Sequence, residues 1–551
     1  MRTRTRMMVP ILLALLTSVW LSACGSNSGG GQSAASSSPA ASAAPDRSGS
    51  GGTLVIGMTA GNIPLPNTPP DQGFEGRRFV GYQIYDALFR WTTDQGDTVP
   101  EVKPALAESY TVSDDKLAWT FKLRQGVKFH DGTPFNADAV VFQMRRISDK
   151  SFEFYDAAVA TNNSSNIGSI AKVEKVDDFT VKFTTKAVNA LLPYDLVFVY
   201  YPSPDAVKKY GNAQYQNHAT GTGPFKMTKY VDGQVMELDA NADYWGGRPK
   251  LDKIVLKPMP EPATRLAALQ SGDINWAELP PPDAVELLKS SGYQVILKEY
   301  PHVITYQLNL NKPALKDVRV RQALNYAMDK KGLVTLINGV GEPSVQYMYK
   351  GHPYYDPSWE GFNYDAAKAK KLLADAGYGS GLKLKIAYPT GGSGNMFPGS
   401  MNEKFKQDLK AVGVDVELVP LEWNTIISGF RAGFGNSDWS QYDGIYFSTA
   451  PISPISAFRS YTTDYIPPKG CCNTTGYSNP AADKLYAEAA ASFDPAKQTE
   501  LLRQFQSTMM KDAPVITTVH DLNLRALSPS VKGFVQPQSW FVDLNQVWIK
   551  K

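Results

Sequence analysis

The chain has 551 residues, which is enough for two or three domains with a large buried core. Hydrophobic residues make up 43% and charged residues 20%, a globular balance that excludes a mostly disordered or fibrous protein. The 56 Lys and Arg residues nearly equal the 53 Asp and Glu residues, which argues against a nucleic-acid-binding protein, and three cysteines exclude a disulfide framework.

The first 23 residues have the organisation of a secretory signal. Arg2, Arg4 and Arg6 form a positive start, and residues 9–21 are a mostly apolar run that is too short to span a bilayer. The run ends in Leu-Ser-Ala before Cys24, which resembles the lipobox of a bacterial lipoprotein with Cys24 as the acylated residue. The alternative is a plain signal peptide with an incidental cysteine.

Residues 24–50 are predicted to be a lipidated cysteine and a disordered tether. Of the 26 residues from 25 to 50, 22 are Gly, Ser, Ala or Pro, so this segment cannot bury enough apolar surface to fold. A multiply acylated (palmitate-bearing) cysteine would anchor the protein firmly to a membrane.

Strand-like and helix-like patterns alternate through the rest of the chain. The predicted strands are residues 53–58, 119–123, 180–184, 253–259, 294–300, 304–310, 382–388, 414–421 and 514–519. Helices are predicted over residues 317–331, after Asp365 and after Asp494, each with an acidic N-cap and apolar residues on one face. The alternation predicts an α/β fold.

Residues 119–142 carry the most specific pattern. A strand is predicted to turn at Gly126, a second short strand at Asp131 and Gly132, and a helix to begin after Asn136. The stretch also closely resembles the signature of the family 5 solute-binding proteins, the dipeptide, oligopeptide and nickel-binding group of ABC importers. Further stretches resemble the family in the same order, namely residues 221–225, 241–246, 265–274, 317–329, 364–378 and 477–480.

The resemblance implies a two-lobed clamshell of the periplasmic-binding-protein type. Lobe one would comprise residues 51–300, with a family-specific subdomain at 91–215, and lobe two residues 301–515. Residues 516–551 would return to lobe one. In such proteins ligand binding favours a closed state, which the membrane permease distinguishes from the open one.

Catalytic and metal-binding patterns are absent from the sequence. His130, His218, His302, His352 and His520 are scattered, without metal-ligand spacing, and no nucleophile or phosphate-binding motif occurs. We therefore expect no cofactor and no enzyme. An extracytoplasmic hydrolase and a cell-surface adhesin remain as alternatives from other classes.

Aromatic residues are the main candidates for ligand contact, because a stacked ring supplies affinity. Trp423 follows Glu422 at the position where the resemblance implies a cleft-lining tryptophan. The other aromatic candidates are Trp276, Trp439, Tyr446, Phe447 and Trp540, with core packing as the alternative for each tryptophan. The loop after Met58, at Asn62 and Ile63, is the candidate from lobe one.

One departure from the family pattern bears on the ligand. The resemblance implies an acid near residues 443–449 that pairs with a peptide ammonium, but Asp443 matches a structural position and the stretch ends in Ser448 and Thr449. These hydroxyls suit a neutral ligand. An oligosaccharide is therefore the alternative to a peptide, unless Asp438 or Asp464 takes over the pairing.

Cys471 and Cys472 are adjacent and extracytoplasmic in this prediction. Oxidised, they would form a vicinal disulfide that offers an apolar plate to a ligand ring. The alternative is a pair of buried thiols or a rigid turn without ligand contact.

The sequence thus predicts a monomeric, lipid-anchored solute-binding protein on the outer face of the cell membrane. It would capture a peptide-like solute, or alternatively an oligosaccharide, and deliver it to ABC permease subunits.

Overall fold

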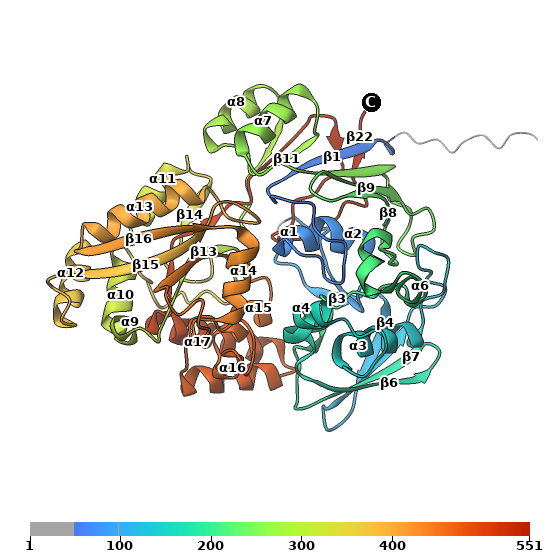
Figure 1. Cartoon of the computed structure of the whole chain (residues 1–551), viewed down its shortest axis with the longest axis horizontal. Helices are drawn as coiled ribbons and strands as arrows, with labels where there is room; N and C mark the ends of the chain where they lie inside the picture. The colour runs from blue at the N-terminus through green and yellow to red at the C-terminus, as the bar shows by residue number, and fades with distance from the viewer. Residues whose placement is uncertain (1–48, 97) are drawn as a thin grey trace, which may run out of the picture. The chain divides into compact units, whose positions relative to one another are not determined.

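The apolar run Thr53–Met58 forms strand β1 at the centre of a seven-stranded sheet in the computed structural model (Figure 1), which describes residues 49–96 and 98–551. Leu54, Ile56 and Met58 are fully buried on this strand. The sheet order is β12-β20-β11-β1-β10-β9-β8. Its other strands are β8 (Phe225–Val231), β9 (Val235–Ala240), β10 (Lys253–Pro258), β11 (Trp276–Glu278), β12 (Gln294–Ile296) and β20 (Arg525–Leu527).

A second, antiparallel sheet is inserted between β1 and β8 in the chain. Its order is β4-β5-β7-β6, from β4 (Ala107–Val112), β5 (Ala118–Leu123), β6 (Ile170–Asp177) and β7 (Thr180–Thr185). Helix α3 (Ala137–Ser148) begins as predicted after Asn136, whose side chain accepts a hydrogen bond from the Ala139 amide. The predicted short strand before it is only an isolated bridge between Lys128 and Pro134.

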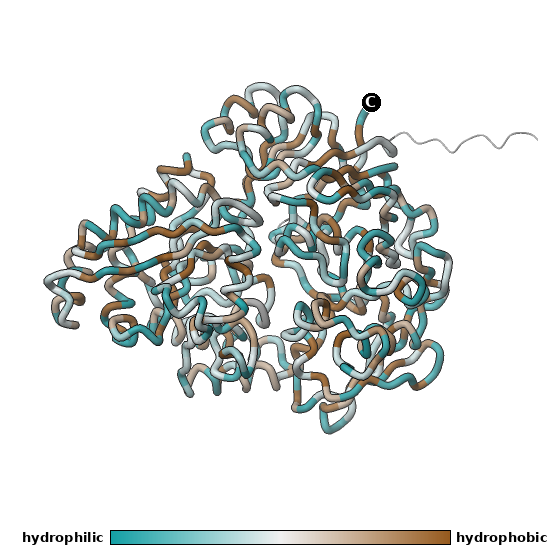
Figure 2. Tube along the Cα trace, viewed as in Figure 1, coloured by the Kyte–Doolittle hydropathy of each residue, from teal (hydrophilic) through white to brown (hydrophobic). Residues whose placement is uncertain are grey.

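A five-stranded sheet occupies the later half of the chain. Its order is β16-β15-β17-β13-β18, from β13 (Val303–Leu308), β15 (Leu382–Pro389), β16 (Val414–Leu421), β17 (Gly444–Thr449) and β18 (Val515–Thr517). Hydrophobic stretches of the chain run along the strands of this sheet (Figure 2). They form a core with the helices α10 (Val318–Tyr326), α12 (Ala366–Asp375) and α13 (Pro398–Lys410).

The predicted helices were correct in position but not all in length. Asp365 and Asp494 cap α12 and α17 (Pro495–Asp512), as expected. The helix predicted over 317–331 is two helices, because the Asp329 side chain accepts from the Gly332 amide and starts α11 (Lys330–Leu336). The predicted strand at 294–300 ends early, at Ile296.

The chain passes between the seven- and five-stranded sheets twice. The first passage follows β12 and ends at β13. The second follows β18 and β19 (Val519–Asp521), which pairs with β14 (Gly341–Pro343), and ends at β20. Near the C-terminus, β22 (Trp548–Ile549) pairs with β21 (Val531–Lys532), and the Ile549 amide donates to the Gly51 carbonyl over 3.0 Å. The two ends of the described chain are therefore neighbours.

Lys330 is a buried cation under the five-stranded sheet. Its ammonium donates to the Ser344 carbonyl over 2.7 Å and to the Thr517 hydroxyl over 3.2 Å. Burial disfavours the charged form and lowers the pKa of Lys330 to about 7, whereas an unfolded chain has a lysine pKa of about 10.4.

This difference predicts a pH dependence of stability. Between pH 7 and 10 the unfolded chain binds more protons than the folded chain, so the free energy of unfolding rises with pH. We expect Lys330 to contribute up to about 1.4 kcal/mol per pH unit in that window, and Lys330→Met to lose this contribution. Urea unfolding of both proteins at pH 7, 8 and 9 measures it, and parallel pH profiles would contradict it.

Candidate functional site

The candidate site lies where the loop after β15 meets the first helix of the chain. This loop comprises residues 391–395, and the Ser393 hydroxyl accepts a hydrogen bond from the Glu75 amide over 3.1 Å. Glu75 lies on α1 (Gly73–Gly76), and a Cβ on Gly73 would lie 3.5 Å from the Trp423 indole nitrogen. Segments that belong to different sheets are thus in direct contact here.

Trp423 is the first residue of α14 (Trp423–Ala432). The Glu422 side chain caps this helix by accepting from the Thr425 amide over 3.1 Å. The Trp423 side chain is 6% exposed and packs on Phe447 with 5.2 Å between ring centroids. Its indole N–H is buried without a hydrogen-bond acceptor among the described residues.

Glycines let the 391–395 loop approach these aromatic rings. Gly392 has φ +97°, and a Cβ there would lie 2.5 Å from Cγ of Trp423. Gly394 has φ +70°, and a Cβ there would lie 2.2 Å from the Ser448 hydroxyl oxygen. Both the backbone conformation and the close approach require glycine at these two positions.

His302 joins several elements beside this loop. Its Nε2 is 2.8 Å from the Ser448 hydroxyl, and its Nδ1 is 2.9 Å from a carboxylate oxygen of Asp521. Burial alone would raise the pKa of Asp521, but the charge of His302 and hydrogen bonds from His302 and Tyr300 hold it below the usual range. The ring of Trp540 stacks on His302 at 5.2 Å, and its indole N–H has no acceptor among the residues described.

Buried charged residues lie on and next to α1, beside the site. Arg78 pairs with Glu278 at 2.6 Å, and Arg525 lies 3.6 Å from the same carboxylate. Burial raises the pKa of Glu75, whose carboxylate accepts from the amide and hydroxyl of Thr59. These pairings satisfy charges that would otherwise be costly to bury.

Several predicted site residues lie in the protein core. Trp276 is fully buried, and its indole N–H donates to Glu278 over 2.5 Å. Trp439 packs on Gly429 and Tyr442. Tyr446 faces the core of the five-stranded sheet. Trp439 belongs to the same apolar cluster as Trp423 and Phe447, whereas Trp276 and Tyr446 belong to other clusters. An aromatic residue of the core and one of a site look alike in a sequence.

The polar candidates have partners inside the protein. The Ser448 hydroxyl is taken by His302, and that of Thr449 lies 3.3 Å from the Thr305 hydroxyl. Asn62 donates to Asp232 over 3.0 Å, and Ile63 is fully buried.

The acids considered for ammonium pairing also have local roles. Asp443 accepts from the Lys385 amide over 2.7 Å, which confirms its structural position. Asp464 is exposed and pairs with Lys469 at 2.5 Å, and Asp438 is exposed. None of these three acids is therefore a buried carboxylate that needs a ligand ammonium as its partner.

Cys471 and Cys472 are joined by a disulfide and are half-buried.

The Tyr-Ser-Asn-Pro motif that follows them is structural. The Tyr477 hydroxyl and the Asn479 amide group both donate to Asp512 over 2.6 Å, and Asn479 caps α16 (Pro480–Ala491). Cys24 lies outside the described residues.

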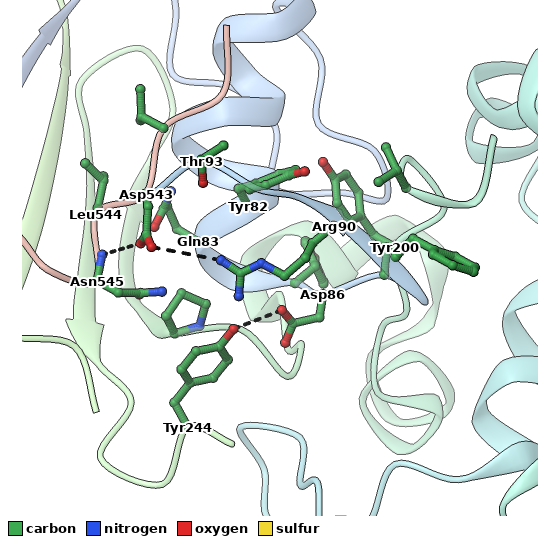
Figure 3. Close-up of a pocket in the computed structure, with 16 residues that line it drawn as sticks. Tyr82, Gln83, Asp86, Arg90, Thr93, Tyr200, Tyr244, Asp543, Leu544 and Asn545 are labelled. Atoms are coloured by element: carbon green, nitrogen blue, oxygen red, sulfur yellow. Dashed lines mark hydrogen bonds and ion pairs between the residues drawn. The ribbon is translucent and has the colours of Figure 1, made fainter. Parts of the chain in front are cut away.

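Two cavities of the described chain lie elsewhere. One holds about 30 Å³, room for one or two water molecules, and is lined by Tyr200, Asp86, Arg90 and Asp543 among others (Figure 3). Its Asp86 is half-buried and accepts from Thr222, Tyr244 and Trp245. The other, of about 610 Å³, is a hollow between α3, α4 (Ala157–Ile167) and β6.

In the described part of the chain, no group of His, Cys, Asp and Glu could hold a metal ion, and no helix is long and apolar enough to cross a membrane.

Residues 101–466 match the profile of a protein family described as "Bacterial extracellular solute-binding proteins, family 5 Middle". The chain belongs to this family.

Relatives of known name support the assignment of this solute-binding protein. It is 31% identical over 476 residues to heme-binding protein A of Haemophilus influenzae, covering 82% of this chain and 84% of the relative. It is 30% identical over 498 residues to the glutathione-binding protein GsiB of Escherichia coli O157:H7, covering 84% and 88%.

Solved structures show the same two-lobed periplasmic-binding-protein fold. DppA of Helicobacter pylori in complex with the peptide STSA matches with a TM-score of 0.80 and 25% identity, over 91% of this chain and 99% of DppA. A dipeptide-binding protein of Pseudoalteromonas sp. SM9913 in complex with Met-Leu matches with a TM-score of 0.79 and 23% identity, over 91% and 100%. The predicted family and fold class are confirmed.

Sequence reasoning missed the loop at residues 391–395. The run Thr390-Gly-Gly-Ser-Gly394 was the available signal, because three glycines in five residues after a strand indicate a close backbone approach.

Proposed function

We propose that this protein is the substrate-binding component of an ABC importer, which takes up a peptide-like solute between its two lobes and delivers it to the membrane permease. The observation that carries the proposal is the match to a peptide complex, DppA with STSA, along nearly the whole folded chain. The protein acts by binding and release and not by catalysis, in keeping with a family of solute-binding proteins.

A peptide is favoured over an oligosaccharide. The relatives quoted above are named for heme, glutathione and peptides. The hydroxyls of Ser448 and Thr449, on which the sugar alternative depended, are used within the protein. We propose Trp423, Phe447 and Trp540 as the aromatic ligand contacts, because two unpaired indole N–H groups suit the carbonyl oxygens of a peptide.

Thermal unfolding of the full-length protein tests this function. The probes are Ser-Thr-Ser-Ala, Met-Leu, reduced glutathione and maltotetraose at millimolar concentration. A ligand at one hundred times its Kd stabilises the folded state by about 2.7 kcal/mol, so Tm rises. We expect a rise with at least one peptide. The proposal would be overturned if only maltotetraose raised Tm, or if none of the four probes raised it.

The sheets support the proposed division into two lobes. Lobe one is proposed to comprise residues 51–300, with 91–215 as its subdomain and 516–551 as a returning strip, and lobe two residues 301–515. Strands of the seven-stranded sheet come from 53–296 and 525–527, and those of the five-stranded sheet from 303–517. We propose that the protein acts as a monomer.

We propose that the protein is anchored outside the cytoplasm by lipid on Cys24, with residues 1–23 as the removed signal. The support is the sequence Leu21-Ser-Ala-Cys24 after a short apolar run. Cys24→Ala is expected to move the protein from the membrane fraction to the soluble fraction of cells, as measured by immunoblot. The paired variant Cys471→Ser with Cys472→Ser keeps Cys24 and is expected to stay with the membrane. Equal membrane retention of Cys24→Ala would contradict the anchor.

A further inference from the structure

The disulfide between Cys471 and Cys472 does not act as an ordinary cross-link. It joins two residues that are neighbours in the sequence, so it closes no loop of the chain. A disulfide that closes a long loop stabilises a fold by restricting the unfolded chain, and a bond between neighbours contributes little of this effect. The effect of this disulfide therefore lies in the backbone around it.

That backbone has an uncommon conformation at Cys472. Its φ is +83°, in the left-handed region that a residue with a Cβ adopts only at a cost in free energy. Such a conformation persists where the surrounding structure imposes it. The disulfide imposes a restraint here, because it ties the side chains on both sides of one peptide bond. We therefore expect Cys472 to leave the left-handed region when the bond is opened.

The residue after Cys472 closes the neck of a loop at residues 462–477. Asn473 is fully buried, and its backbone amide donates to the Tyr465 carbonyl over 3.1 Å. Its side-chain amide group donates to the carbonyls of Thr462 and Tyr477 over 2.9 and 2.8 Å. A change of φ at Cys472 rotates the chain directly before Asn473, so these three hydrogen bonds cannot all be kept.

Thr474 connects this loop to the end of α14. Its hydroxyl donates to the Phe430 carbonyl over 2.6 Å, and its carbonyl accepts from the Phe434 amide over 3.2 Å. Phe430 and Phe434 would bond directly to each other if the helix continued, but α14 ends at Ala432. Thr474 is therefore inserted into the next hydrogen bond of the helix and satisfies both of its partners.

The same end of α14 supports the aromatic residues of the candidate site. Phe430 stacks on Phe447 with 4.1 Å between ring centroids, and Phe447 packs on Trp423. Phe434 belongs to the same apolar cluster as Trp423. Loss of the Thr474 contacts would therefore loosen the packing behind Trp423.

We propose that Cys471 and Cys472 form a reversible exchange site for low-molecular-weight thiols, and that reduction of the disulfide releases Thr474 from the end of α14. Both cysteines are half-buried, so a small thiol reaches them from solvent. This inference goes beyond the proposed function, which requires ligand capture alone. Its consequence for ligand affinity rests on the proposed function.

The exchange proceeds in two steps. A thiolate RS⁻ attacks one cysteine sulfur, so that an RS–S bond forms, the S–S bond of the protein breaks and the other sulfur leaves as a thiolate. A second RS⁻ attacks the sulfur of RS in this mixed disulfide and releases the first cysteine as a thiolate. The two cysteine thiolates take up the two protons that the RSH molecules gave up. The protein disulfide gains two electrons, and two RSH are oxidised to RSSR.

Alkylation of the folded, full-length protein tests the exchange site. The protein is treated with millimolar 2-mercaptoethanol, which is uncharged and is not among the ligand probes, and then with iodoacetamide without denaturant. We expect two alkyl groups on the tryptic peptide of residues 470–484, which contains both cysteines. An unmodified peptide from the folded protein, together with full modification in urea, would overturn the exchange site.

Hydrogen exchange tests the connection to α14. In the reduced protein we expect the segment that contains the Phe434 amide to exchange about tenfold faster or more, because this amide loses its acceptor on Thr474. Helix α12 has no contact with the loop and is expected to exchange at the same rate in both forms. If the Phe434 segment also exchanged equally in both forms, reduction would not reach α14 and the connection would be wrong.

Two double variants separate the backbone effect from the loss of sulfur. Cys471→Ser with Cys472→Ser removes the bond and keeps a Cβ at residue 472. Cys471→Ser with Cys472→Gly also removes the bond, but glycine adopts a positive φ without strain. We expect the first variant to exchange like the reduced protein and the second to stay closer to the oxidised protein. Equal behaviour of the two variants would show that φ of Cys472 is not the link.

Titration with Ser-Thr-Ser-Ala measures the consequence for the ligand site. We expect reduction, and the variant with two serines, to weaken binding by about threefold or more. An unchanged affinity, with faster exchange at Phe434, would show that the thiol site is not coupled to the ligand site. If neither form bound the peptide, this result would count against the proposed function, and alkylation and hydrogen exchange would still decide the thiol site.

Discussion

Replacing Arg459 with methionine is expected to lower the free energy of unfolding by about 3–5 kcal/mol, because the change leaves a buried carboxylate without its cation. Arg459 pairs with Asp195 at 2.7 Å, and both side chains are at least 90% buried. Burial raises the pKa of Asp195 to about 6 even with the arginine present. Arg459 follows α15 (Pro454–Phe458) and Asp195 lies on α5 (Leu192–Leu196), so the pair joins distant parts of the chain.

Chemical denaturation monitored by tryptophan fluorescence measures this loss. The double variant Arg459→Met with Asp195→Leu removes both charges, and it is expected to recover most of the lost stability. Arg145→Met controls for loss of an exposed arginine on α3, which pairs with Asp149, and is expected to change stability by less than about 1 kcal/mol. A midpoint for Arg459→Met equal to that of the unchanged protein would show that the pair contributes nothing.

The second large effect is expected at Gly394. In Gly394→Ala the new methyl group would lie 2.2 Å from the Ser448 hydroxyl, 2.8 Å from Nε2 of His302 and 3.0 Å from the Trp540 ring. The positive φ adds backbone strain for a residue with a Cβ. We expect a loss of about 2–4 kcal/mol in unfolding free energy and at least a tenfold loss of peptide affinity.

Gly391→Ala is the matched control in the same loop. No heavy atom lies within 4 Å of its Cβ position, and its φ is outside the positive region. Its stability and affinity are expected to stay close to those of the unchanged protein. If Gly394→Ala behaved like Gly391→Ala, the loop would not pack on Ser448 and Trp540 as described.

Local features of the fold were predictable because their causes are local. Strand β1 has its predicted bounds, and Asp317, Asp365 and Asp494 cap helices as their side chains allow. The break near Asp329 was missed, since Ala327 and Met328 continue the apolar period of the preceding helix and are buried in the same core. The apolar pattern alone does not show where one helix stops and the next begins.

The site was less predictable, because its contacts join residues far apart in the chain. Glu75 and Ser393 are 318 residues apart, and His302 and Ser448 are 146 apart. The family resemblance indicated Trp423 as a cleft-lining residue, and in the structure Trp423 lies against Gly392 of the loop that follows β15. Aromatic character alone could not exclude Trp276, whose N–H is already used by Glu278.

The two ends of the described chain lie side by side, so the chain could be joined end to end. Because the Ile549 amide reaches the Gly51 carbonyl, a linker of a few residues would join the C-terminus to residue 49. A circular permutant opened at an exposed surface loop, such as Gly379, would keep both sheets and both passages between them. Such a permutant could carry a fluorescent reporter at its new ends.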